Sequence, residues 1–126
     1  MKLVSLEQLL QIHALLIQET GGSAGLRDLG RLEAALATQT QHVFDQELYE
    51  GELVKAAALI RALVADHPFV DGNKRTAMLT GLTFLRINEV SFNIPEKALE
   101  DFAVKIAVDK LDISDIAAWL ESQTGN

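Results

Sequence analysis

Apolar residues recur along most of the chain at intervals of three and four, the spacing that places them on one face of an α-helix. The first such run follows Ser5, which has a glutamine three residues later as in a capping box, and it should end near Glu19, where two glycines follow. A second helix should begin near Asp28. Residues 38–50 are polar and ambiguous, so we expect irregular structure or a short helical turn there.

The middle of the chain carries the two strongest helical patterns. The third helix should run from about 52 to 66, and the fourth from 73 to 87, where apolar residues lie on nearly every side, as in a central helix. Pro95 suits the first position of a fifth helix. A sixth should be capped by Asp112 or Ser114. The pattern therefore predicts an all-α fold, a compact bundle of about six helices with the fourth as its axis.

Length and composition favour one domain spanning residues 1–126, because a chain of this length can bury a single core. There are no cysteines, which excludes disulfides and thiolate chemistry. The formal charge of -7 argues against general affinity for nucleic acid or anionic membranes, so any anion site must be local. No apolar run is long enough to span a bilayer and no signal peptide is recognisable, so we expect a cytoplasmic protein.

The sequence H-P-F-V-D-G-N-K-R, residues 67–75, interrupts the helical pattern between the two central helices. His67 continues the apolar stripe of the third helix, which places it at the C-terminal end of a core-facing helix. Phe69 should anchor the loop in the core. Gly72 permits the backbone of a tight turn, and Asn73 is a suitable N-cap for the fourth helix.

The two cations that follow need an explanation. Lys74 and Arg75 in a first turn oppose the helix dipole, at about 0.3–1 kcal/mol each, unless an anion lies there. Phosphate is the usual ligand of such a turn. Asp71 would repel it unless Mg²⁺ intervened, and His67 could accept a proton from an attacking hydroxyl. Each residue alone also suits a structural role, but together they form a candidate phosphoryl- or nucleotidyl-transfer site.

The motif resembles the signature of the Fic/Doc family, and more closely its Doc (death-on-curing) branch. The resemblance extends to residues 21–37 before the motif and 74–88 after it, and it weakens beyond Phe92. It implies an all-helical fold with the motif loop between two central helices.

The resemblance also implies a role for each motif residue. His67 would be the catalytic general base, Asp71 the Mg²⁺ ligand, and Phe69 the anchor of the loop. ATP phosphates would lie against the last four residues of the motif, which are Gly72, Asn73, Lys74 and Arg75.

Lys74 bears on the reaction. Typical Fic proteins have glycine there and transfer AMP, whereas the lysine of the Doc branch crowds the place of the α-phosphate. The resemblance thus implies an ATP- and Mg²⁺-dependent protein kinase that transfers the γ-phosphate to a threonine of elongation factor Tu and arrests translation as a toxin. Pro68 and Gly72 match the residues of the general Fic motif, which leaves AMP transfer open. A catalytically silent module that binds nucleotide or an antitoxin is the third alternative.

The remaining expectations concern control and neighbouring residues. The inhibitory pattern Ser/Thr-x-x-x-Glu-Gly/Asn of Fic proteins is absent from the sequence, and the Doc resemblance implies inhibition by a Phd-type antitoxin in trans. His13 lies on the apolar face of the first helix and is expected to be packed and hydrogen-bonded. Arg27, Asp28 and Arg31 either form surface ion pairs or line the site. Arg61 and Arg86 flank the motif helices and are expected at the surface, with contact to a phosphate as the alternative.

Overall fold

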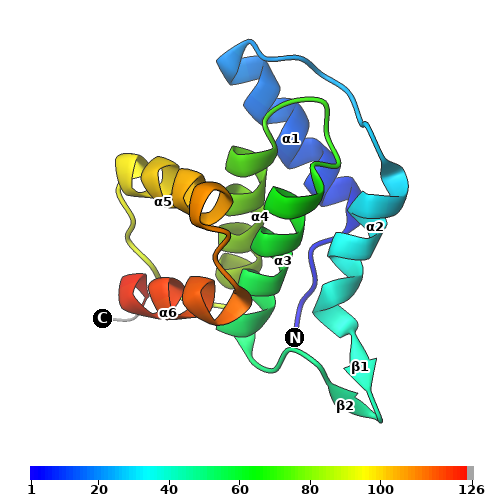
Figure 1. The fold of residues 1–126 in the computed structure, drawn as a ribbon, viewed down its shortest axis with the longest axis vertical. Helices are drawn as coiled ribbons and strands as arrows, with labels where there is room; N and C mark the ends of the chain where they lie inside the picture. Colours follow the sequence, from blue (N-terminus) through cyan, green and yellow to red (C-terminus); the bar gives the residue numbers. More distant parts are fainter. Residues whose placement is uncertain (125–126) are drawn as a thin grey trace.

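A computed structural model describes residues 1–124, and over that range the chain forms a helical bundle with one small hairpin (Figure 1). The helices confirm the all-α prediction, and their number over residues 1–124 is the expected six. They are α1 (Leu6–Thr20), α2 (Leu29–Ala37), α3 (Glu52–Asp66), α4 (Asn73–Ile87), α5 (Glu96–Asp109) and α6 (Ile113–Gln123). The short elements are a 3₁₀ turn, η1 (Thr38–Thr40), and the strands β1 (His42–Val43) and β2 (Gln46–Glu47).

Two antiparallel helices, α3 and α4, form the centre of the bundle, and the motif loop joins them. The prediction that α4 alone is the axis was wrong. α3 contacts α2, α4, α5 and α6, whereas Leu79 and Lys74 of α4 are exposed. The alanine-rich middle of α3 explains this, because small side chains let several helices approach it closely.

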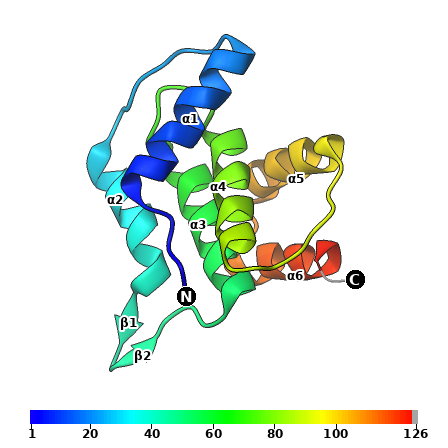
Figure 2. The same cartoon turned by 180° about the vertical axis from the view of Figure 1, so that it is seen from behind.

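The outer helices cover the central pair from two sides. α1 and α2 lie on one side and α5 and α6 on the other (Figures 1 and 2). Their ends follow the sequence signals: Gly21 ends α1 in a left-handed conformation, Asp28 caps α2, and Asp112 caps α6 in a capping box. Pro95 precedes α5 as its N-cap and is not its first helical residue.

For residues 38–50 the sequence predicted irregular structure or a short helical turn. The structure contains the turn and also a hairpin that was not predicted. After η1, the strands β1 and β2 pair as an antiparallel hairpin at the end of α3 farthest from the motif loop (Figure 1). Lys55 of α3 holds it there: its buried Nζ donates to the carbonyl of Gln39 at 2.8 Å and pairs with Glu47 at 3.1 Å. The hairpin is thus tied to the bundle by a buried charge with two partners.

Within residues 1–124, no helix combines the length and the apolar character that crossing a membrane requires.

Candidate functional site

The motif loop, residues 67–72, begins with a left-handed residue that ends α3. His67 has φ 46° and ψ 60°, and it is exposed. His67 thus ends α3 as predicted, and its side chain is exposed because the left-handed turn breaks the helical periodicity of the apolar stripe. Arg27 stabilises the turn, since its Nε donates to the His67 carbonyl at 2.9 Å. Arg31 donates to the carbonyl of Asp66 at 2.9 Å.

These two arginines were predicted either to form surface ion pairs or to line the site, and the structure gives them a further role. Arg31 does pair with Asp28 at the surface, 3.4 Å away. In addition, both guanidinium groups satisfy the last carbonyl groups of α3, where cations are favoured by the helix dipole. They fix the backbone from which the His67 side chain projects.

The next part of the loop is anchored in the core. Phe69 is 2% exposed, and its ring stacks on that of His13 with centroids 3.8 Å apart. The Nε2–H of His13 donates to the carbonyl of Asp71 at 2.8 Å, because a carbonyl can only accept. His13 is thus packed and hydrogen-bonded as expected, and it ties α1 to the motif.

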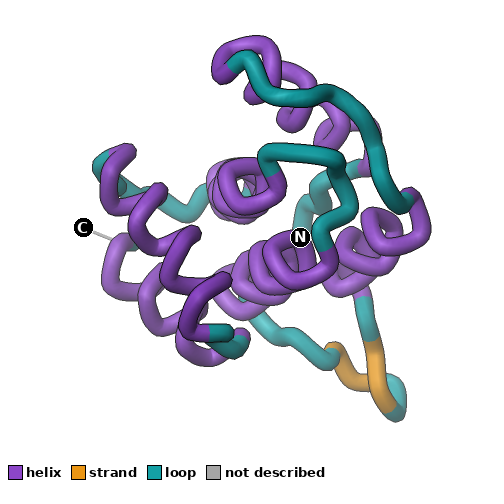
Figure 3. The backbone as a smooth tube through the Cα atoms, turned by 45° about the horizontal axis from the view of Figure 1, so that its top comes forward, coloured by secondary structure: helices purple, strands orange, loops and turns teal. Residues whose placement is uncertain are grey.

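A second segment, residues 21–28 between α1 and α2, runs beside the motif loop (Figure 3). Leu26 and Phe69 form an isolated antiparallel bridge, and the N–H of Val70 donates to the carbonyl of Gly25 at 3.1 Å. The N–H groups of Arg27 and Asp28 both donate to the Pro68 carbonyl. Backbone pairing therefore holds the two loops as one unit.

The start of α4 departs from the prediction at one residue. Gly72 is the N-cap, with φ 75°, a left-handed conformation that favours glycine. Asn73 is the first helical residue instead. Its side-chain oxygen accepts from the Phe69 N–H and its amide donates to the Phe69 carbonyl, both at 2.9 Å. Asn73 thus closes the motif loop on itself and leaves the helix end open.

That open helix end offers unused donors. The first intrahelical bond of α4 runs from the Thr76 N–H to the Gly72 carbonyl, at 3.0 Å. The backbone N–H groups of Asn73, Lys74 and Arg75 donate to no residue in the described part of the chain. Lys74 is exposed beside them. Three free N–H groups, a helix dipole and a lysine make a site for an anion.

Asp71 lies next to these donors as a charged group. Its carboxylate accepts from the N–H of Ser23 at 3.1 Å and from the N–H of Gly72 at 2.8 Å. These two bonds, first Ser23 and then Gly72, lower the pKa of Asp71 below its ordinary value. Gly22 allows the Asp71 carboxylate to lie this close to the backbone of residues 21–28, because a Cβ at Gly22 would lie 2.6 Å from Asp71 Oδ2.

A metal ion at this place would need ligands beyond the protein. In residues 1–124, no three His, Cys, Asp or Glu side chains converge as a metal site. Asp71 offers one ionised carboxylate next to an anion site, and Mg²⁺ characteristically binds one or two carboxylates together with phosphate oxygens and water. The residues therefore fit Mg²⁺ carried by a nucleotide.

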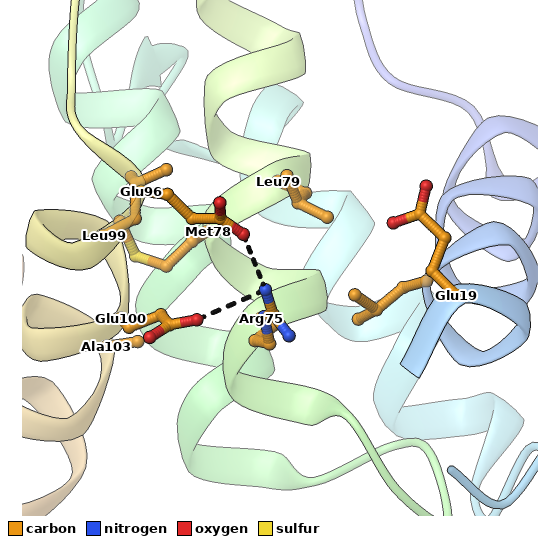
Figure 4. Close-up of a pocket in the computed structure, with 9 residues that line it drawn as sticks. Glu19, Arg75, Met78, Leu79, Glu96, Leu99, Glu100 and Ala103 are labelled. Atoms are coloured by element: carbon orange, nitrogen blue, oxygen red, sulfur yellow. Dashed lines mark hydrogen bonds and ion pairs between the residues drawn. The ribbon is translucent and has the colours of Figure 1, made fainter. Parts of the chain in front are cut away.

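Arg75 is already paired. Its Nη2 lies 3.1 Å from Glu96 and 3.3 Å from Glu100, both on α5 (Figure 4). With Glu19 of α1, these carboxylates line a hollow between α1, α4 and α5, which we call the acidic hollow. Its apolar wall consists of Leu16, Met78, Leu79, Leu99 and Ala103. A phosphate that binds Arg75 must therefore compete with two glutamates.

A second hollow lies where the C-terminal ends of α3 and α5 meet, and His67 is part of its wall. Arg61 and Lys110 line it as well, and no carboxylate does, so we call it the basic hollow. Both cations are exposed, and neither forms an ion pair with a described residue. The sequence pattern gave no sign of either hollow.

Comparison with known proteins gives a consistent result. The model of the Fic/DOC family matches residues 3–85. The "Toxin Doc" of Mycolicibacterium smegmatis is 39% identical over 102 residues, which is 79% of this chain and 78% of that protein. The "Protein kinase doc" of Escherichia phage P1 is 35% identical over 127 residues, covering 100% of this chain and 98% of that protein. The bundle, the motif loop and these matches agree, and the chain belongs to the Fic/DOC family.

Proposed function

We propose that this chain is a Doc-type toxin with protein kinase activity, which transfers the γ-phosphate of Mg²⁺-ATP to a serine or threonine hydroxyl of a translation factor. The two relatives named Toxin Doc and Protein kinase doc support this activity, because they match most or all of the chain. Elongation factor Tu is the acceptor that we propose, on the resemblance to the Doc branch.

The site supplies the parts that phosphoryl transfer needs. The three free N–H groups at the start of α4, with Lys74, would hold the γ-phosphate. Asp71 would bind the Mg²⁺ that neutralises the phosphate oxygens. His67 would take the proton of the acceptor hydroxyl, whose oxygen bonds to the γ-phosphorus while the bond to the bridging oxygen breaks and ADP leaves.

The acidic hollow is the observation that favours γ-phosphate transfer over AMP transfer. In an in-line displacement the leaving group departs on the side of the phosphorus opposite the attacking oxygen, which here is the side away from His67. The acidic hollow, whose lining includes Arg75 but not His67, carries Glu19, Glu96 and Glu100 around an apolar wall. Both leaving groups carry two phosphates. The far end of a departing pyrophosphate is a charged phosphate that the three carboxylates would repel, whereas the far end of a departing ADP is an uncharged nucleoside that could lie over the apolar residues.

A labelling experiment tests the proposed reaction. The protein is incubated with Mg²⁺, elongation factor Tu and ATP that carries its label at either the α- or the γ-phosphate. We expect label on elongation factor Tu only from γ-labelled ATP. Label from the α-position alone would identify an AMP-transferase, and no label from either position would leave a binding module as the better account.

We also propose that a Phd-type antitoxin controls the toxin from outside the chain. The sequence lacks the inhibitory pattern of Fic proteins, so a separate partner would be needed to silence the site. Expression of the chain alone should arrest growth, and expression of Asp71→Ala should not. Equal arrest by both would mean that catalysis is not the cause of toxicity.

A further inference from the structure

The basic hollow is placed to receive whatever carries the acceptor hydroxyl. Its walls come from the last turns of α3 and from the C-terminal end of α5, and they include His67. Its volume is about 300 Å³, at the lower limit of the range typical of ligand pockets. A group that occupies it lies against His67, and its lining shares no residue with that of the acidic hollow.

The chemistry of its lining defines what would bind. Val64 and Ile106 form a buried apolar floor, while Ala107 and Leu111 are partly exposed. At the rim, Arg61 and Lys110 are exposed cations in a chain whose formal charge is -7. Because the two cations have no carboxylate partner in the hollow, they complement an acidic group of a ligand. The apolar floor complements aliphatic groups next to that acidic group.

In-line geometry assigns this ligand to the acceptor. The attacking oxygen must approach the phosphorus from the side opposite the leaving group, and the general base must reach the attacking hydroxyl. His67 is exposed and lines the basic hollow. The acidic hollow repels the anion that the basic hollow would attract, so the two are not interchangeable.

We propose that the basic hollow is the docking site of the acceptor protein, and that it binds an acidic residue close in space to the acceptor hydroxyl. The aliphatic part of that segment packs on Val64 and Ile106 while its carboxylate lies between Arg61 and Lys110. The inference rests on the proposed kinase function, and it names the part of the site that selects the protein substrate.

The test is steady-state transfer from γ-labelled ATP to elongation factor Tu by the full chain. The double variant Arg61→Ala/Lys110→Ala should raise KM for elongation factor Tu by about tenfold, because it removes the charges that pair with the acceptor. It should leave KM for ATP unchanged. The salt dependence of KM for elongation factor Tu should also weaken, since fewer charges remain to be screened.

A matched control removes the same charge elsewhere. Arg86→Ala/Lys105→Ala also deletes one arginine and one lysine that are exposed and have no ion-pair partner among the described residues. Neither residue lines the basic hollow. An equal rise in KM with this control would show that net charge alone steers the acceptor, which would overturn the docking site.

The outcomes separate this inference from the proposed function. If the unmodified chain transfers no phosphate to elongation factor Tu, the proposed acceptor is wrong, and the docking inference fails with it for this protein. If transfer occurs but Arg61→Ala/Lys110→Ala keeps its KM for the acceptor, only the docking site is wrong. If the variant instead raises KM for ATP, the hollow binds nucleotide phosphates, which also contradicts the inference.

Discussion

The acidic hollow and the basic hollow differ mainly in charge. The acidic hollow holds Glu19, Glu96 and Glu100 around one arginine, whereas the basic hollow holds Arg61 and Lys110 beside His67 without a carboxylate. Both have an apolar wall. In the proposed reaction, this difference in charge would separate the side that receives the nucleotide from the side that receives the acceptor.

The contrast has a simple origin in α5, which contributes to both hollows. Glu96 lies in its first turn and Lys110 at its C-cap. Each is at the end where the helix dipole stabilises its charge. A helix with this ordinary distribution of charge, laid across the ends of α3 and α4, makes one side of the site acidic and the other basic.

The largest expected effect comes from His67, which lines the basic hollow. His67→Ala should lower kcat for phosphate transfer by about 10²–10⁴-fold, the usual contribution of a general base. His42→Ala, at an exposed histidine of the hairpin, is the control and should transfer normally. If His67→Ala turns over as fast as the control, His67 is not the general base, and the argument that the acceptor binds in the basic hollow fails.

The next effect concerns Asp71. Asp71→Asn should reduce Mg²⁺-dependent transfer by about a hundredfold, because the variant loses the proposed ligand of the Mg²⁺ that neutralises the phosphate charge. Asp101→Asn, which neutralises an exposed carboxylate of α5 outside both hollows, is the control. Full activity of Asp71→Asn at limiting Mg²⁺ would contradict the assignment.

The lowered pKa of Asp71 makes a separate prediction about stability. A depressed folded-state pKa stabilises the fold above the unfolded pKa, and this contribution is lost as the pH falls through the folded value. The difference in melting temperature between the wild type and Asp71→Asn should therefore be the same at pH 7 and pH 5 and shrink only below about pH 4. A difference that shrinks already near pH 6 would contradict the N–H bonds from Ser23 and Gly72.

A smaller effect is expected at His13, which donates to the Asp71 carbonyl in the motif loop. His13→Phe keeps an aromatic ring against Phe69 but leaves the Asp71 carbonyl without its donor. We expect a loss of about 1 kcal/mol in stability. We also expect a fall of about tenfold in kcat, because the turn is less well positioned.

His13→Gln, which can still donate a hydrogen bond, should restore part of that activity. The measurement is thermal unfolding together with transfer kinetics. If His13→Phe unfolds at a lower temperature but transfers at the wild-type rate, His13 is structural only.

The smallest effect concerns the acidic hollow alone. Glu96→Gln/Glu100→Gln should lower KM for ATP by about two- to tenfold, because each exposed ion pair with Arg75 is worth about 0.2–1 kcal/mol. KM for the acceptor should not change. Asp101→Asn, which breaks the exposed pair with Lys97 on the same helix, is again the control. An unchanged KM for ATP would mean that Arg75 takes no part in binding the phosphates.

The sequence predicted the ends of the helices well where residues that begin or end a helix are present. The limits of α3 and α4 agree with the expected 52–66 and 73–87, and Pro68 and Gly72 within the motif mark the ends at which the two helices meet the loop. The hairpin was missed because its turn uses Phe44 and Asp45 at positive φ, where no glycine marks it.

The candidate site was predictable only as far as local spacing reaches. The motif residues stand together in sequence, so their association in one loop was expected. The exposure of His67 depends on a left-handed turn, and the pairing of Arg75 with Glu96 joins residues 21 positions apart. Neither has a periodic signal, because each depends on how helices pack.

The orientation of the nucleotide is the central claim, and a crystal structure of the chain with Mg²⁺ and a non-hydrolysable ATP analogue tests it most directly. We expect the γ-phosphate at the free N–H groups of Asn73, Lys74 and Arg75, with Mg²⁺ on Asp71 and the nucleoside over the acidic hollow. An α-phosphate at those N–H groups, or a nucleoside in the basic hollow beside Arg61, would contradict the account.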